Sequence, residues 1–312
     1  ARVYLDIGNI NGAATLLEQL GPSTDPNIQL LLAEAYLKKS KFRSAQSTLT
    51  KISPPLQSTQ AWTKNVLTFK TSLSQKRYSD AAASLSTLIP LASTPENNAE
   101  QAFLTASLLL RQNKNTDASA ELEKALTLNP NYTDALLMKA SIAYRSNKIE
   151  ESDDILSDAL LTLDDTDIML PKKVNVIRAL IDVLSTLGRS SEALIYTKML
   201  ASNNPEAAEQ KSKLKDAIDQ YKAGNYESAE AQLLAINAET PNTISRQLLG
   251  ALNLKKGNLE KAETFLSEDF DPETASSKSI SLLARTQFSL KQPDKVLALL
   301  AEEVKARSDN PE

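Results

Sequence analysis

The chain of 312 residues contains no cysteine and no histidine, and it has only seven glycines and one tryptophan. Without cysteine or histidine it cannot form a disulfide framework, a thiolate nucleophile, a zinc site built from these ligands or a histidine-dependent catalytic triad. Glycine makes up about 2% of the chain against a usual ~7%, which argues against glycine-rich phosphate loops and β-hairpin turns. These absences exclude most familiar kinds of catalytic site.

The residues that are abundant favour a folded, helical protein. Apolar residues make up 41% and charged residues 24% of the chain, which is enough for a core. Alanine, leucine, serine, glutamate and lysine dominate, and all but serine are strong helix formers. The net charge of −4 lacks the basic excess of a nucleic-acid binder, so no nucleic-acid partner is expected. No apolar run approaches the ~18 residues of a membrane span, so none is expected in this chain.

A unit of the form Ala-x3-Leu, preceded by an apolar or aromatic residue, recurs about every 35 residues, which is the spacing of a helical repeat. Nine units fit the chain. Their small-residue positions are Ala13, Ala45, Ala81, Ala118, Ser152, Ala193, Ala229, Ala262 and Val296.

Each unit is predicted to form two helices. The first helix has apolar residues with helical spacing, and the second carries the Ala-x3-Leu face, whose small residue lets the two backbones approach. A short polar turn separates the helices, and prolines lie at the boundaries between units. The turns are placed at Gly8, Ser40, Asn113, Asn147, Gly188, Gly224 and Gly257.

This pattern resembles the tetratricopeptide repeat, most closely in residues 99–132, with Ala106, Ala118, Leu122 and Asn129-Pro130. The resemblance implies an all-α fold, a right-handed α-solenoid of about nine helix-turn-helix repeats, the first truncated. We expect one solenoid domain over residues 1–312, with a possible bend at 163–172, where extra residues separate two units. Because the chain opens on what looks like the middle of a helix, we expect a piece of a longer polypeptide.

In such a solenoid the first helices line a concave surface where partners bind. Apolar or aromatic residues recur late in these helices, often beside a cation. The candidate groove contacts are Arg111, Tyr144, Arg145, Tyr221, Lys222, Lys255 and Phe288. One interpretation is a binding stripe for an acidic peptide or an anionic polysaccharide. The other is that the cations only complement the helix dipoles at C-termini.

No group of residues points to a reaction, so we predict that the protein is not an enzyme and needs no cofactor. The acidic segment Asp164-Asp165-Thr166-Asp167 resembles a cation site but lacks the glycine and distal glutamate of a calcium loop. We interpret it as a solvated linker and predict no metal site.

The segments 221–233, 248–263 and 282–285, and the turn Gln292-Pro293-Asp294-Lys295, look like those of bacterial tetratricopeptide lipoproteins associated with exosortase (PEP-CTERM) exopolysaccharide loci. That resemblance implies a periplasmic or cell-envelope scaffold for protein partners in polysaccharide assembly, export or secretion. Two alternatives stay open. The groove could bind an anionic polysaccharide or acidic peptide directly, or the chain could be a cytoplasmic assembly adaptor.

Overall fold

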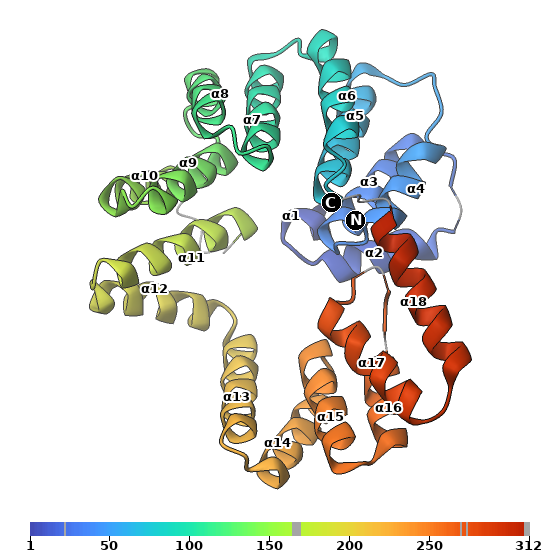
Figure 1. Ribbon diagram of the computed structural model, residues 1–312. Helices are drawn as coiled ribbons and strands as arrows, with labels where there is room; N and C mark the ends of the chain where they lie inside the picture. Colours follow the sequence, from blue (N-terminus) through green and yellow to red (C-terminus); the bar gives the residue numbers. More distant parts are fainter. Residues whose placement is uncertain (22, 164–169, 269, 273, 309–312) are drawn as a thin grey trace. The chain divides into compact units, whose positions relative to one another are not determined.

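The computed structural model describes residues 1–308 except 22, 164–169, 269 and 273, and leaves the side chains of 206–208 and 302–308 undescribed. The described residues form eighteen α-helices and one short 3-10 helix, with no strand among them, which confirms the all-α prediction. The chain divides into two compact units, residues 1–200 and 201–312, and each is described by itself (Figure 1).

The helices follow one another in antiparallel pairs, and the first pair has a very short first helix, as the truncated first repeat predicts. Residues 1–200 contain α1 (Arg2–Asp6), α2 (Ile10–Gln19), α3 (Pro26–Lys38), α4 (Phe42–Lys51), α5 (Ser58–Ser74), α6 (Tyr78–Leu88), η1 (Ile89–Leu91), α7 (Pro95–Arg111), α8 (Asn115–Leu128), α9 (Thr133–Arg145), α10 (Ile149–Thr162), α11 (Pro171–Thr186) and most of α12 (Ser190–Asn203).

The second unit continues the same alternation of helices. It contains α13 (Pro205–Lys222), α14 (Tyr226–Glu239), α15 (Thr243–Lys256), α16 (Leu259–Ser267), α17 (Ser277–Ser289) and α18 (Pro293–Ser308). Proline is the first residue of several helices, where its missing N–H costs no hydrogen bond. Pro293, which the sequence places in an internal turn, takes this position in α18.

Every turn inside a helix pair contains one residue with a left-handed backbone, with φ between 57° and 85°. Glycine adopts this conformation without steric cost, and asparagine tolerates it better than other residues. After this residue the chain hydrogen-bonds back into the helix just ended, as in Lys148 N to Ala143 O at 2.9 Å. The nine residues are Gly8, Ser40, Lys76, Asn113, Asn147, Gly188, Gly224, Gly257 and Lys291. The seven predicted turns are thus confirmed, and lysine occupies the remaining two.

Within each repeat, the buried core lies between the two paired helices. The predicted small residue of the second helix is buried in eight of the nine pairs, and Leu122, Leu156 and Leu233 four residues later are also buried. First helices of neighbouring pairs also contact one another, as α3 does α5, α9 does α11 and α15 does α17. First helices therefore form a layer of their own, which positions the site described next.

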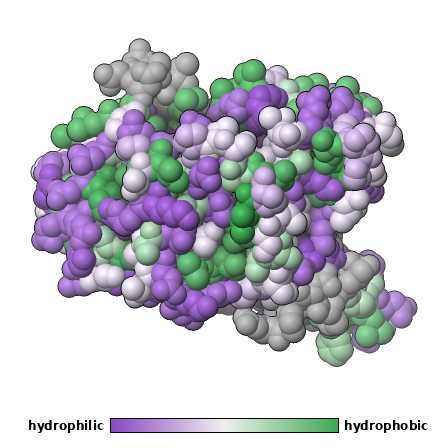
Figure 2. All heavy atoms as spheres, turned by 90° about the horizontal axis from the view of Figure 1, so that it is seen from above, coloured by the Kyte–Doolittle hydropathy of each residue, from purple (hydrophilic) through white to green (hydrophobic). Residues whose placement is uncertain are grey.

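The surface is a mosaic of small hydrophobic and hydrophilic areas over the face shown in Figure 2. Within the described part of the chain, no helix is both long enough and apolar enough to cross a membrane.

Candidate functional site

One position of the first helix lies nine residues before the left-handed turn residue, and in α5, α7 and α9 its side chain packs against the preceding repeat. Eight helix pairs have a full-length first helix, and in seven of them a large side chain occupies this position. The residues are Leu31, Leu67, Leu104, Met138, Ala179, Lys215, Leu248 and Leu282. Leu104 is 1% exposed and packs against α5 and α6, and Met138 packs against the cluster formed by α7 and α8. Ala179 is the only small residue at this position.

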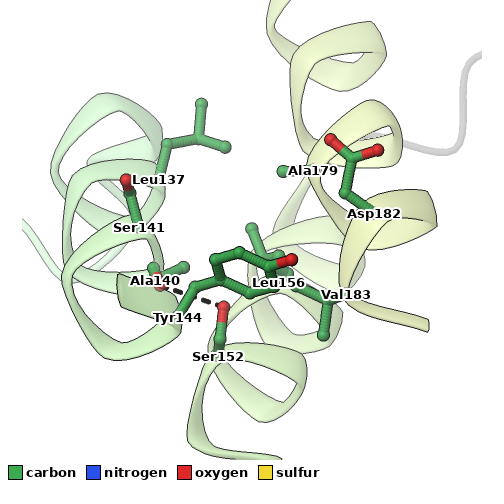
Figure 3. Close-up of a pocket in the computed structure, with 9 residues that line it drawn as sticks. All are labelled: Leu137, Ala140, Ser141, Tyr144, Ser152, Leu156, Ala179, Asp182 and Val183. Atoms are coloured by element: carbon green, nitrogen blue, oxygen red, sulfur yellow. Dashed lines mark hydrogen bonds between the residues drawn. The ribbon is translucent and has the colours of Figure 1, made fainter. Parts of the chain in front are cut away.

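A pocket of about 160 Å³ lies where the missing side chain would be. This volume is close to that of an engineered protein cavity of about 150 Å³ that takes up benzene. Three helices of the first unit form the pocket: α9, α10 and α11. The lining residues are Leu137, Ala140, Ser141, Tyr144, Ser152, Leu156, Ala179, Asp182 and Val183 (Figure 3).

The floor of the pocket is apolar and well ordered by packing. Leu156 is 1% exposed and Val183 3%, and both belong to the core cluster shared by α9, α10, α11 and α12. The polar group of Ser152 is already satisfied, because its hydroxyl donates to the Ala140 carbonyl at 2.9 Å. The floor therefore offers an apolar surface without a competing hydrogen-bonding group.

Tyr144 forms one wall and reaches from α9 towards α11 (Figure 3). Its hydroxyl lies 2.9 Å from the Thr186 hydroxyl, which fixes the ring across the gap between the two helices. The side chain is 37% exposed, so one side of the ring remains accessible. An exposed aromatic ring held by a hydrogen bond is a suitable wall for an apolar ligand group.

Two polar side chains at the rim, Ser141 and Asp182, have unused hydrogen-bonding capacity. Neither side chain makes a hydrogen bond or ion pair with another residue in the described part of the chain. Arg178 lies one helical turn before Asp182 but is beyond ion-pair distance. The pocket thus combines an apolar interior with one hydroxyl and one carboxylate at its edge, an arrangement suited to binding.

Among the groove contacts predicted in the first unit, Tyr144 is the one that lines this pocket. Arg111 and Arg145 are exposed at the C-terminal ends of α7 and α9, and neither forms an ion pair with a described residue. The positions of these two cations fit either interpretation, a ligand contact or a complement to the helix dipole. The prediction that they bind a partner stays a prediction.

In the second unit two of the predicted groove contacts, Tyr221 and Lys255, both lie against the ring of Tyr226. Tyr221 packs edge-on against Tyr226, with ring centroids 5.7 Å apart. The Lys255 ammonium lies 4.1 Å from the centre of the Tyr226 ring and donates to its hydroxyl, and this hydrogen bond raises the pKa of Lys255. Lys222 is exposed at the end of α13, and Phe288 is 74% exposed. Lys255 thus already contacts an aromatic ring of its own chain.

In several turns a cation pairs with a carboxylate of the chain. Arg189 donates to Glu192 at 2.7 and 2.5 Å and also contacts Asp153 of α10. Lys148 lies 3.0 Å from Glu151 in the corresponding place of the preceding pair. These cations connect a turn to the start of the second helix, where negative charge also suits the helix dipole.

The described residues contain no group of three or more acidic side chains placed to hold a metal ion. The acidic segment 164–167, and most of the predicted bend at 163–172, lie outside the described residues. The sequence prediction did not name the pocket itself. The signal was present in Ala179, which only an alignment of the repeats on their turn residues makes visible.

Comparison with known proteins agrees with this fold. The family model of the tetratricopeptide repeat matches residues 109–170, which include the whole of α8, α9 and α10. No curated protein matches the chain.

Three solved structures are similar to the chain, each at low identity. They are the Pseudomonas aeruginosa pilF protein (14% identity, 80% of this chain and 92% of that chain, TM-score 0.38), a tetratricopeptide repeat protein from Parabacteroides merdae (15%, 80% and 94%, TM-score 0.39) and YrrB, described as a tetratricopeptide repeat protein with an unusual peptide-binding site (20%, 63% and 92%, TM-score 0.31). Such superpositions are too loose to carry an argument about function. The family match identifies residues 109–170 as tetratricopeptide repeat sequence. The helix-turn-helix form of this segment recurs at all nine left-handed turns of the chain.

Proposed function

We propose that this protein is a non-catalytic scaffold that binds a segment of a protein partner along the first helices of residues 1–200, with a side chain of the partner seated in the α9–α11 pocket. The tetratricopeptide fold suggests protein–protein interaction in general. The observation that carries the specific proposal is the apolar pocket beside the half-exposed ring of Tyr144. An extended segment could use the pocket as an anchor and the adjoining helices as a support.

We further propose that the scaffold serves a bacterial envelope system for exopolysaccharide assembly, export or secretion, and that it works in the periplasm or at the cell envelope. The support is the resemblance of residues 221–233, 248–263 and the turn at Gln292-Pro293 to the lipoproteins of such systems. A cytoplasmic assembly adaptor is the alternative. The identity of a captured partner distinguishes the two.

Site-specific photo-crosslinking in the cell of origin tests both parts of the proposal. A photoreactive phenylalanine analogue replaces Tyr144, and the matched control places it at Asp158, which is exposed on α10. We expect a protein adduct from position 144 and none from position 158, with an envelope protein of the polysaccharide system identified by mass spectrometry. Equal adducts from both positions would contradict binding at the first helices, and a cytoplasmic partner would contradict the envelope setting.

Direct binding of an anionic polysaccharide is a second candidate, and one observation favours it. Arg111 and Arg145 are both exposed, and neither is neutralised by an ion pair within the described residues. Calorimetric titration with a polyuronate oligosaccharide at moderate salt tests it. Binding that is lost in Arg111→Glu and Arg145→Glu would support this candidate, whereas no heat and no chemical-shift change would exclude it.

A further inference from the structure

The α9–α11 pocket has a charge at its edge that restricts what can enter it. We propose that it recognises a two-residue feature of a protein partner: a medium-sized apolar side chain that fills the pocket, next to a lysine or arginine that pairs with Asp182. This inference rests on the proposed function, because it names the partner chemistry that the same site would select.

The size and lining of the pocket determine the apolar half of the feature. Its volume of about 160 Å³ suits one aliphatic or small aromatic side chain. The groups around it are the apolar faces of Leu137, Leu156, Ala179 and Val183 and the ring of Tyr144. Burying such a side chain from water is favourable, and no polar group of the floor has to lose a hydrogen bond.

Asp182 determines the charged half of the feature. It is the only charged residue that lines the pocket, and its side chain has no ion-pair partner within the described part of the chain. A cation next to the apolar side chain would gain an interaction there, whereas a carboxylate would be repelled. The rim hydroxyl of Ser141 can in addition hydrogen-bond to the backbone of an extended segment.

One substitution, Ala179→Leu, can fill the pocket without disturbing the fold around it. Leucine or methionine stands at the position of Ala179 in the preceding repeats, so Ala179→Leu should fill the pocket with a side chain that this fold accommodates. The variant removes the binding space without removing a core contact. Loss of binding in this variant would therefore not reflect loss of folding.

The experiment is selection of a random twelve-residue peptide library on the immobilised chain, with Ala179→Leu, Asp182→Asn and Asp182→Lys selected in parallel. We expect peptides enriched on the native chain to contain an aliphatic or aromatic residue beside lysine or arginine, and Ala179→Leu to bind them about tenfold more weakly or worse. Asp182→Asn should weaken binding up to about fivefold, in a salt-dependent way. Asp182→Lys should shift the preference to glutamate or aspartate.

The possible failures separate the inference from the function on which it rests. Enriched peptides that lose binding in Ala179→Leu but contain no lysine or arginine would contradict the role of Asp182. The proposed scaffold function would not be affected by that result. Peptides that bind Ala179→Leu as well as the native chain would overturn the pocket as their site. Failure to enrich any peptide, together with no adduct from position 144 in cells, would contradict the proposed function itself.

Discussion

The α7–α9 and α9–α11 junctions are built from equivalent helices, yet one is filled and the other has a pocket. In the first junction Met138 packs into the α7–α8 cluster, and the rings of Phe103 and Tyr132 pack at an angle of 54° with their centroids 5.2 Å apart. Burial in this packed junction, with Glu100 and Asp134 nearby, raises the pKa of Tyr132 well above its usual range. In the second junction Ala179 replaces the large side chain, and a pocket opens. In a repeat fold, one shortened side chain can therefore open a pocket without altering the backbone pattern.

The largest effect is expected when a filled junction is emptied. Leu104 is 1% exposed in the core of α5, α6 and α7, at the position equivalent to Ala179. Leu104→Ala should lower the free energy of unfolding by about 3 kcal/mol, because it loses apolar burial and leaves a cavity. Urea denaturation measures the loss. A cost below about 1 kcal/mol would mean that this junction is as loosely packed as α9–α11.

Filling the empty junction should have the opposite sign. Ala179→Leu should raise the free energy of unfolding by about 1 kcal/mol, because the added side chain occupies apolar space that is already present. Ala83→Leu on the exposed surface of α6 is the matched control, expected to change stability by a few tenths of a kcal/mol. A loss of stability of more than about 1 kcal/mol in Ala179→Leu would indicate overpacking and contradict the pocket.

The turns beside the two junctions keep the same backbone with different residues. Gly188 has φ of 75° with no atom near the place of a side chain, whereas Asn147 adopts φ of 61° in the preceding turn. Gly188→Ala should cost about 1 kcal/mol through backbone strain alone, since no clash is involved. Gly188→Asn, measured alongside by thermal unfolding, should cost less. Equal costs for the two variants would show that the left-handed conformation is not the cause.

The smallest effect concerns acid sensitivity of the α11–α12 turn. Hydrogen bonds from Arg189 lower the pKa of Glu192. Because the folded pKa is depressed, the interaction contributes stability above the usual glutamate pKa of about 4.3, and this contribution is lost as the pH falls through the folded pKa. Glu192→Gln should therefore show a shallower decline in stability below that pH than the native chain.

The corresponding substitution in the preceding turn, Glu151→Gln, is the matched comparison for this last effect. Lys148 makes a single contact with Glu151, so the curve should change less there. Denaturation midpoints measured from pH 7 to pH 3 compare the three proteins. A steeper acid decline in Glu192→Gln than in the native chain would contradict the assigned sign.

Much of the fold could be predicted because local chemistry and repetition agree. Glycine and asparagine mark turns such as those at Asn113 and Gly188, and buried alanines such as Ala118 mark the close approach of paired helices. In the turns before α6 and α18 the left-handed residues, Lys76 and Lys291, could not be named from the sequence, because lysine has no preference for a left-handed backbone. There the regular spacing of the helices, rather than the residue type, determines the conformation.

The site was less predictable because it depends on a side chain that is missing. The sequence prediction selected large and charged residues, and Tyr144 was the one that proved to line the pocket. Ala179 has no chemical group that suggests a ligand contact. Asp182 becomes a candidate contact only because the structure places it beside the pocket. In the second unit, Lys255 was predicted from its position to face a ligand, but its contact with Tyr226 required three-dimensional packing.

The most direct measurement of the central claim is the affinity of one peptide, the most enriched on the native chain, for the native protein and for Ala179→Leu, with the stability of both proteins recorded under the same conditions. The account predicts that Ala179→Leu binds the peptide about tenfold more weakly or worse, while it is at least as stable as the native protein. Unchanged affinity in a stable, folded Ala179→Leu would contradict the assignment of the α9–α11 pocket as the binding site.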